Sequence, residues 1–202
     1  MQKQKITEYR GVQDLVYAEV TQDSSEGYVT GEVKHLAGVA EISKSTESSS
    51  EPHYYDNVPA IVIDSVGADE ITCTVSAIPL DVLAEINGHY YDEATGMLVE
   101  GERESKYFAL GYRTQKTDGT EVLVWRLKGT FSIPESTHVT KDDGTDANGQ
   151  EITFTGISTS HIFKKTGKPA KAVNVDTIKD LIDTTTFFDT VQTPDTVVAK
   201  TV

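Results

Sequence analysis

Cysteine, basic residues and long apolar runs are scarce in this chain of 202 residues. The single cysteine, Cys73, excludes an intramolecular disulfide and a zinc site built from several cysteines. No stretch approaches the roughly 18 consecutive apolar residues that indicate a membrane-spanning helix. The N-terminus has a charged start with no apolar segment behind it, unlike a signal peptide. We therefore expect a protein suited to a reducing cytoplasm that neither spans a membrane nor carries a signal peptide.

The shortage of basic residues limits the partners that the chain can bind. Lysine and arginine number 18 against 32 acidic residues, which gives a formal net charge of -14. Tight binding to nucleic acid by counterion release needs clustered basic side chains. The one short basic segment, Lys164 to Lys171, is interpreted as a solvated connection. Specific binding of DNA or RNA is not expected.

Catalytic motifs are also missing from the sequence. It holds no GxSxG elbow, no phosphate-binding loop of the GxxxxGK[ST] type and no GxGxxG turn after a strand. The aspartates between Lys141 and Gln150 lack the spacing of an EF-hand, and this segment is predicted to be a loop. The sequence therefore predicts no enzyme, no catalytic residue, no cofactor and no metal. None of the five histidines has the spacing of a metal motif: His35, His53, His89, His138 and His161.

What is present is a series of strand patterns. ITCTVSA, from Ile71 to Ala77, alternates apolar and polar residues, which predicts a half-buried strand with Cys73 on its apolar face. Buried thiols are usually inert, so Cys73 is interpreted as a small core residue. PAIVIDSV, from Pro59 to Val66, is predicted to be a separate short strand. GVQDLVYAEV, from Gly11 to Val20, favours a strand without a strict period.

The strongest hairpin pattern runs from Lys106 to Lys128. Two strand-like segments flank KTDGT, where Asp118 and Gly119 suit the positive φ angles of a tight primed turn. Leu123, Trp125 and Leu127 share one face of the second strand. Because aromatic rings carry the largest apolar areas, Trp125 is expected to anchor the core.

Two segments favour helices. The first runs from Pro79 to Gly88, with a left-handed stop at its end. Its apolar stripe, Leu80, Leu83 and Ala84, is expected to cover the sheet above Trp125. The second runs from Asp176 to Phe188, where Asp176 can cap the first turn. A boundary after Lys168 divides the chain into a β domain, 1–168, and a C-terminal arm, 169–202, that packs on its own body or on a neighbour.

A long polar tract, SKSTESSSEPHYYDN, separates two of the expected strands. Connections of this length without regular structure are uncommon in compact domains and are usually functional or disordered. Tyrosines are enriched at protein interfaces because they combine a flat apolar face with a hydroxyl. The tract is therefore interpreted as a hairpin extension that reaches a neighbouring subunit. Its candidate contact residues are Lys44, Ser45, Thr46, Glu47, Ser48, Ser49, Ser50, Tyr54, Tyr55, Asp56 and Asn57.

These segments, taken in order, resemble the major tail proteins of long-tailed bacteriophages, particularly those that infect Gram-positive hosts. The resemblance covers roughly Tyr9 to Thr166. It rests on YRGVQDLVYAEV through SKSTESSSEPHYYDNVPAIVI, on HYYDEATGMLVEG, and on KYFALGYRTQKTDGTEVLVWRLKGTFSIP. No single motif carries it, and the segment after Lys168 lies outside it.

The resemblance implies a mainly β protein, a β-sandwich or barrel-like tail-tube fold with one flanking helix. It also implies rings of six subunits that stack into the virion's tail tube, through which DNA passes without specific binding. Family members use the loop that corresponds to the polar tract in ring stacking. The implied partners are other copies of the chain and the tape-measure, terminator and distal tail proteins, with synthesis in the bacterial cytoplasm.

Polar positions on the alternating strands are the candidates for the channel lining, since the opposite positions are apolar. They are Glu41, Ser43, Ser45, Glu70, Thr72, Thr74 and Ser76. Other functions remain open: a tail terminator or head-tail connector ring, a monomeric β-sandwich binding module, or a hydrolase with a metal assembled across distant loops.

Overall fold

The protein is mainly β, with one α-helix. A computed structural model describes residues 6–140 and 148–200. Most of the loop expected from Lys141 to Gln150 lies outside these residues. The elements, in chain order, are β1 (Tyr9–Asp23), β2 (Tyr28–Thr30), β3 (Lys34–His35), β4 (Val39–Tyr55), β5 (Val58–Val75), α1 (Leu80–Asn87), β6 (Tyr90–Asp92), β7 (Met97–Val99), β8 (Phe108–Lys116), β9 (Glu121–Phe131), β10 (Glu135–Ser136), β11 (Gln150–Gly156), β12 (Ala172–Asp176) and a 3-10 turn (Thr177–Lys179).

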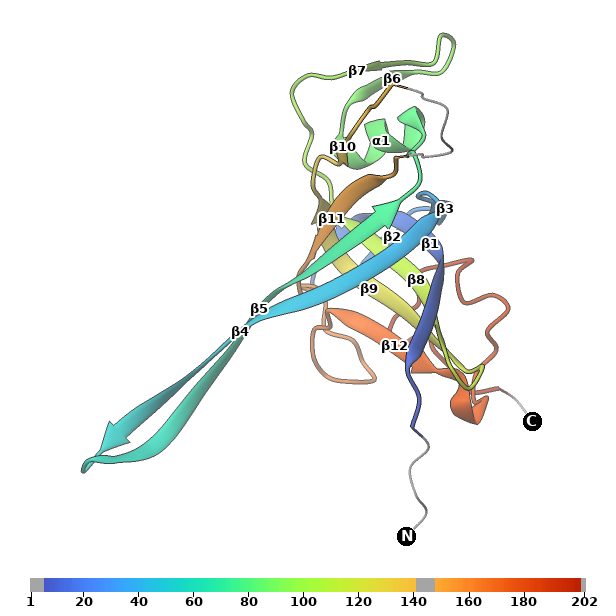
Figure 1. The fold of residues 1–202 in the computed structure, drawn as a ribbon. Coiled ribbons are helices and arrows are strands. Elements are labelled where there is room, and N and C mark those ends of the chain that lie inside the picture. The colour runs from blue at the N-terminus through green and yellow to red at the C-terminus, as the bar shows by residue number, and fades with distance from the viewer. Residues whose placement is uncertain (1–5, 141–147, 201–202) are drawn as a thin grey trace.

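Antiparallel pairing joins most of these strands into one ten-stranded sheet with the central order β2-β1-β8-β9-β11-β5-β4. β3, β10 and β12 attach to β1, β11 and β9, and β6 and β7 form a separate small sheet. The sheet bends so that β5 and β4 pass across β1, β8 and β9 (Figure 1). The first hydrophobic cluster lies inside this bend, with Tyr17, Ile71, Cys73, Phe131 and Phe154 among its members.

A second hydrophobic cluster covers the outer face of β1, β8 and β9. It contains Leu123, Trp125 and Leu127, as the alternation of β9 predicted, while Val124 belongs to the first cluster. Its other half comes from the C-terminal segment, through Phe187 and Val191. β9 is therefore buried on both faces, and the segment after Lys168 packs on the body of its own chain.

Trp125 is fully buried, but the expected partner was wrong. Its Nε1 donates a hydrogen bond to the Phe187 carbonyl at 3.1 Å, and its ring lies 5.8 Å from the Phe188 ring. Across the ladder it faces Gly111, where a Cβ would come within 2.9 Å of the indole. Helix α1 instead contacts the first cluster, on the other side of the sheet. The error arose because β9 has two buried faces and sequence periodicity does not say which element covers each.

Helix α1 forms where it was predicted. Gly88 adopts the left-handed conformation at its end, φ 65, where a Cβ would meet the Glu104 carbonyl. Ala84 and Ile86 are buried and Leu83 is partly buried, whereas Leu80 is 50% exposed and is not a core residue. Tyr17 Oη donates to Glu85 Oε2 at 2.6 Å, which ties the helix to β1.

Other local predictions needed correction. The segment from Asp176 to Phe188 forms only a 3-10 turn capped by Asp176, because a run of threonines is a poor helix former. In the β8–β9 turn only Gly119 has a positive φ, so Asp118 does not complete a primed turn. The irregular pattern of β1 has a cause: register shifts interrupt its pairing with β8, and residues 15–18 are buried on both faces.

Replacing Trp125 with alanine should lower the free energy of unfolding by about 3 to 5 kcal/mol, since the indole is fully buried between β8 and the C-terminal segment. Urea denaturation followed by circular dichroism measures the change. Val29→Ala, at a position 48% exposed, should change it by less than about 0.5 kcal/mol. Equal stability of Trp125→Ala and the parent would contradict the buried position of the indole.

Candidate functional site

The polar tract is not a loop but the outer half of a long hairpin. β4 and β5 pair from Ser48–Val66 to Tyr55–Val58, with one register shift between His53 and Tyr54, and this projecting part is named the hairpin arm, residues 48–66. At about 3.3 Å per residue, it reaches roughly 25 Å. Asp56 and Asn57 close it with positive φ angles of 50 and 65, which suit a two-residue primed turn. The arm extends away from the body of the molecule (Figure 1).

The interpretation of the tract as part of a hairpin extension is therefore confirmed, whereas the expectation of a separate short strand from Pro59 to Val66 was wrong. Residues 58–75 form one strand, and the serine tract pairs with its β-branched half. Ser49 Oγ and Ser65 Oγ lie 2.7 Å apart across the ladder. Serine alone has little strand preference, so the partner strand stabilises this segment.

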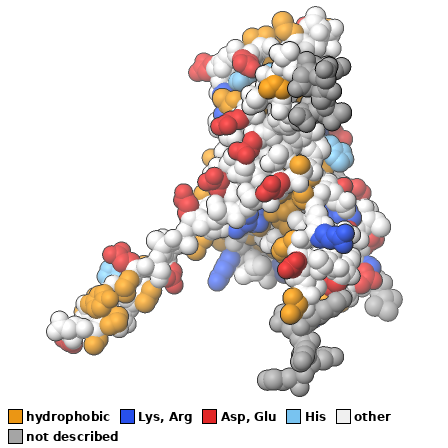
Figure 2. All heavy atoms as spheres, viewed as in Figure 1, with side chains coloured by type: hydrophobic (Ala, Val, Ile, Leu, Met, Phe, Trp, Pro, Cys, Tyr) orange, Lys and Arg blue, Asp and Glu red, His pale blue; other side chains and the backbone are white. Residues whose placement is uncertain are grey.

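Apolar side chains on the arm are exposed to solvent. The exposed fractions lie between 52% and 66%, and the side chains gather at the outer end of the arm (Figure 2). The strand register places them on both faces of the hairpin, so neither face is covered by the rest of the described chain. The set is Tyr54, Tyr55, Val58, Ile61, Val62, Ile63 and Val66. Only the two tyrosines were identified from the sequence, because the segment from Pro59 to Val66 was assigned to a separate short strand.

The arm is acidic. Glu47, Glu51, Asp56 and Asp64 lie between Ser45 and Gly67, and this part of the chain has no lysine or arginine. An apolar surface with only negative charges on it suits a partner surface that is apolar and positively charged.

The arm root is fixed by Asp69, a buried carboxylate on β5. Thr46 Oγ1 donates to it at 2.8 Å and Arg126 Nη1 lies 3.0 Å from it. Lys44 Nζ and Lys171 Nζ lie 3.7 and 3.6 Å away. Removing one partner of a buried ion pair leaves an uncompensated charge, so this cluster ties the base of the arm to β9 through Arg126. Lys44 and Thr46, predicted as loop contacts, belong to this root instead.

A polar face runs over the outer side of β4, β5 and β11. The register pairs Glu41 with Thr74, Ser43 with Thr72 and Ser45 with Glu70, so these predicted residues do share one face. They are exposed except for Thr72, which is half-buried. Ser76 lies beyond β5, where its Oγ accepts a hydrogen bond from Gly38 N. Through its pairing with β5, β11 adds three residues that sequence analysis missed: Glu151, Thr153 and Thr155.

The described residues offer few side chains suited to catalysis or metal binding. Cys73 is 1% exposed, and its burial raises the pKa of the thiol to about 12. Within residues 6–140 and 148–200, no three His, Cys, Asp or Glu side chains are close enough to bind a metal ion together.

Comparison of the sequence with known families and curated proteins identifies no relative. Searches against protein-family models and against curated proteins found no match. In the part of the chain that the structure describes, no helix has the length and apolar character needed to cross a membrane.

Cys73 should react with a thiol reagent at pH 8 at least about a hundredfold more slowly in the folded protein than in denaturant, because burial excludes the reagent and suppresses the thiolate. Absorbance of the released chromophore gives both rates. Rapid reaction of the folded protein would show that β5 opens readily or that the thiol lies at the surface.

Proposed function

We propose that this protein is a structural subunit that assembles with copies of itself, as rings of six stacked into the tail tube of a bacteriophage. The exposed apolar hairpin arm is the observation that carries the proposal. Soluble monomers rarely display a large contiguous apolar patch, and such patches mark interaction sites. The arm is a fixed strand pair, so a partner can bind it without first ordering a loop.

Self-assembly is favoured over a monomeric binding module by the shape of the chain. A projecting arm that docks on a different surface of the next copy makes a head-to-tail contact. Contacts of this kind close into rings or continue as filaments, depending on the rotation between subunits. A tube of stacked rings therefore needs one contact that closes the ring and another that continues from ring to ring.

The polar face supports a channel lining. Glu41, Glu70 and Glu151 point away from the first hydrophobic cluster, among threonines and serines. Carboxylates repel phosphates, so a channel with this surface lets DNA slide without binding. In this proposal the chain is not an enzyme, its place is the virion tail, and its other contacts are tape-measure, terminator and distal tail proteins.

Changing both Tyr54 and Tyr55 to serine should leave a folded subunit that no longer polymerises, because the outer end of the arm loses its two aromatic side chains. Sedimentation velocity and electron microscopy measure assembly, and circular dichroism checks folding. The matched control is the second tyrosine pair, Tyr90 and Tyr91, which lies on the body and should tolerate the same change. Tubes of ordinary length from the Tyr54/Tyr55 variant would contradict the role of the arm.

Changing Glu70 and Glu151 together to lysine should leave tubes intact but slow or stall genome ejection at low salt, where charges are least screened. Ejection triggered in vitro at two salt concentrations measures the effect. Glu93→Lys combined with Glu100→Lys, outside the polar face, is the charge-matched control. Normal ejection from the Glu70/Glu151 variant would contradict the placement of the polar face in the channel.

A further inference from the structure

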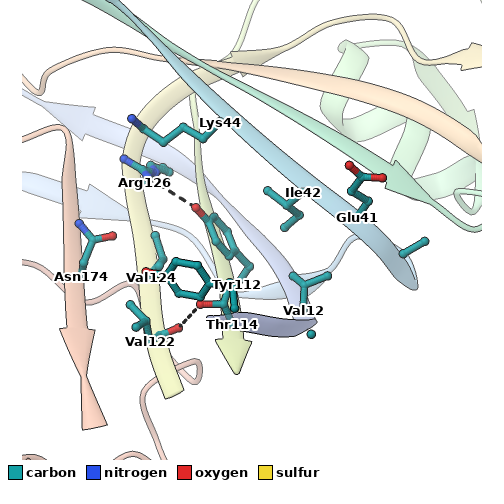
Figure 3. A pocket seen from close by; sticks show the side chains of 13 residues that line it. Val12, Glu41, Ile42, Lys44, Tyr112, Thr114, Val122, Val124, Arg126 and Asn174 are labelled. Atoms are coloured by element: carbon teal, nitrogen blue, oxygen red, sulfur yellow. Dashed lines mark hydrogen bonds between the residues drawn. The ribbon is translucent and has the colours of Figure 1, made fainter. Parts of the chain in front are cut away.

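A groove lies where the bent sheet comes closest to closing on itself. Its volume is about 580 Å³, and its walls come from β1, β8 and β9 on one side and β4 on the other (Figure 3). Val12, Ile42, Val122 and Val124 make much of it apolar, and Tyr112 and Thr114 also line it. We name it the seam groove. It continues the first hydrophobic cluster to the surface, since Tyr112 and Val124 belong to both.

Positive charge borders one end of the seam groove. Lys44 and Arg126 line it, and Lys171 joins them around the Asp69 carboxylate. Three cations therefore face one anion, which leaves an excess of positive charge in a protein whose net charge is -14. Arg126 Nε is also buried without a hydrogen-bond partner in the described part of the chain. Glu41 is the one carboxylate in the lining.

The hairpin arm has the complementary properties but cannot reach the groove of its own chain. Lys44 lines the groove and lies at the arm root, and from there the arm leads away from the body (Figure 1). The arm is apolar on both faces, acidic and free of basic residues. A hairpin arm that occupies the groove therefore belongs to a second copy.

We propose that the seam groove is the acceptor site for the hairpin arm of another copy of this chain. The tyrosines and aliphatic side chains near the arm's turn lie against Val12, Ile42 and Val122 of the acceptor. Asp56 and the neighbouring acidic groups approach Lys44 and Arg126. This inference rests on the proposed self-assembly and specifies its contact: every subunit donates one arm and accepts one.

Two complementary variants test the contact. The arm-less subunit has residues 48–66 replaced by an Asn-Gly turn and keeps its groove. The groove-filled subunit, Thr114→Trp, keeps its arm; Thr114 is a half-buried strand residue in the lining, and strands tolerate aromatic residues. Ala40→Trp, at an exposed lining position, is a second way to fill the groove if Thr114→Trp does not fold. Thr30→Trp on β2, away from the groove, is the matched control.

Each defective variant alone should associate at least about a hundredfold more weakly than the parent, because one half of every contact is missing. An equal mixture of the two should form a complex of one copy each that grows no further, as only one arm and one groove are intact. Sedimentation velocity distinguishes these species. Thr30→Trp should assemble like the parent.

The outcomes separate this inference from the proposed function. If the parent forms tubes and both groove-filled variants do so too, the arm docks elsewhere and the acceptor assignment is wrong while the tube proposal stands. If the mixture forms the expected complex but the parent forms only open chains, the acceptor site stands and the tube proposal fails. A parent that stays monomeric, with no complex in the mixture, overturns both.

Discussion

The structure depends on one constraint: the apolar side chains of the hairpin arm cannot be buried by the chain that carries them. β4 and β5 pair with each other along the arm, with one register shift near its outer end, and the two-residue turn at Asp56 and Asn57 closes the hairpin. A strand pair buries backbone hydrogen bonds but leaves both faces open, and here both faces carry valine, isoleucine or tyrosine. Exposure of these apolar side chains to water is unfavourable, and covering them with another surface is favourable.

The body of the molecule is built so that the arm can stay extended. Its sheet is covered inside by the first hydrophobic cluster and outside by the C-terminal segment, so the body has no need of the arm for its own core. The Asp69 cluster then joins the arm to β9 and to the segment before β12 through Arg126 and Lys171. A rigid root reduces the ordering cost of binding, because the arm already has the conformation in which it is used.

Sequence patterns predicted the elements that depend on local rules. The alternation from Ile71 to Ala77, the β8–β9 hairpin, helix α1 and the burial of Cys73 all follow from periodicity and turn residues, and the structure confirms them, although Ala77 itself lies beyond the strand and is exposed. The faces of β4 and β5 also followed, since Glu41, Ser43 and Glu70 lie together on the polar face.

Features that depend on distant pairing could not be predicted. Trp125 is covered by Phe187 and Phe188, more than sixty residues later, in a segment whose predicted helix does not form beyond a 3-10 turn. The apolar run from Val58 to Val66 looks like a core strand, and only its pairing with the serine tract places it in solvent. The turn residues Asp56 and Asn57 were the available signal for that pairing.

Negative-stain electron microscopy of the unmodified protein at high concentration tests the central claim most directly. The account predicts rings or tubes, because each exposed arm is covered only when another copy accepts it. A field of single small particles at every concentration, with monomeric mass in solution, would contradict it.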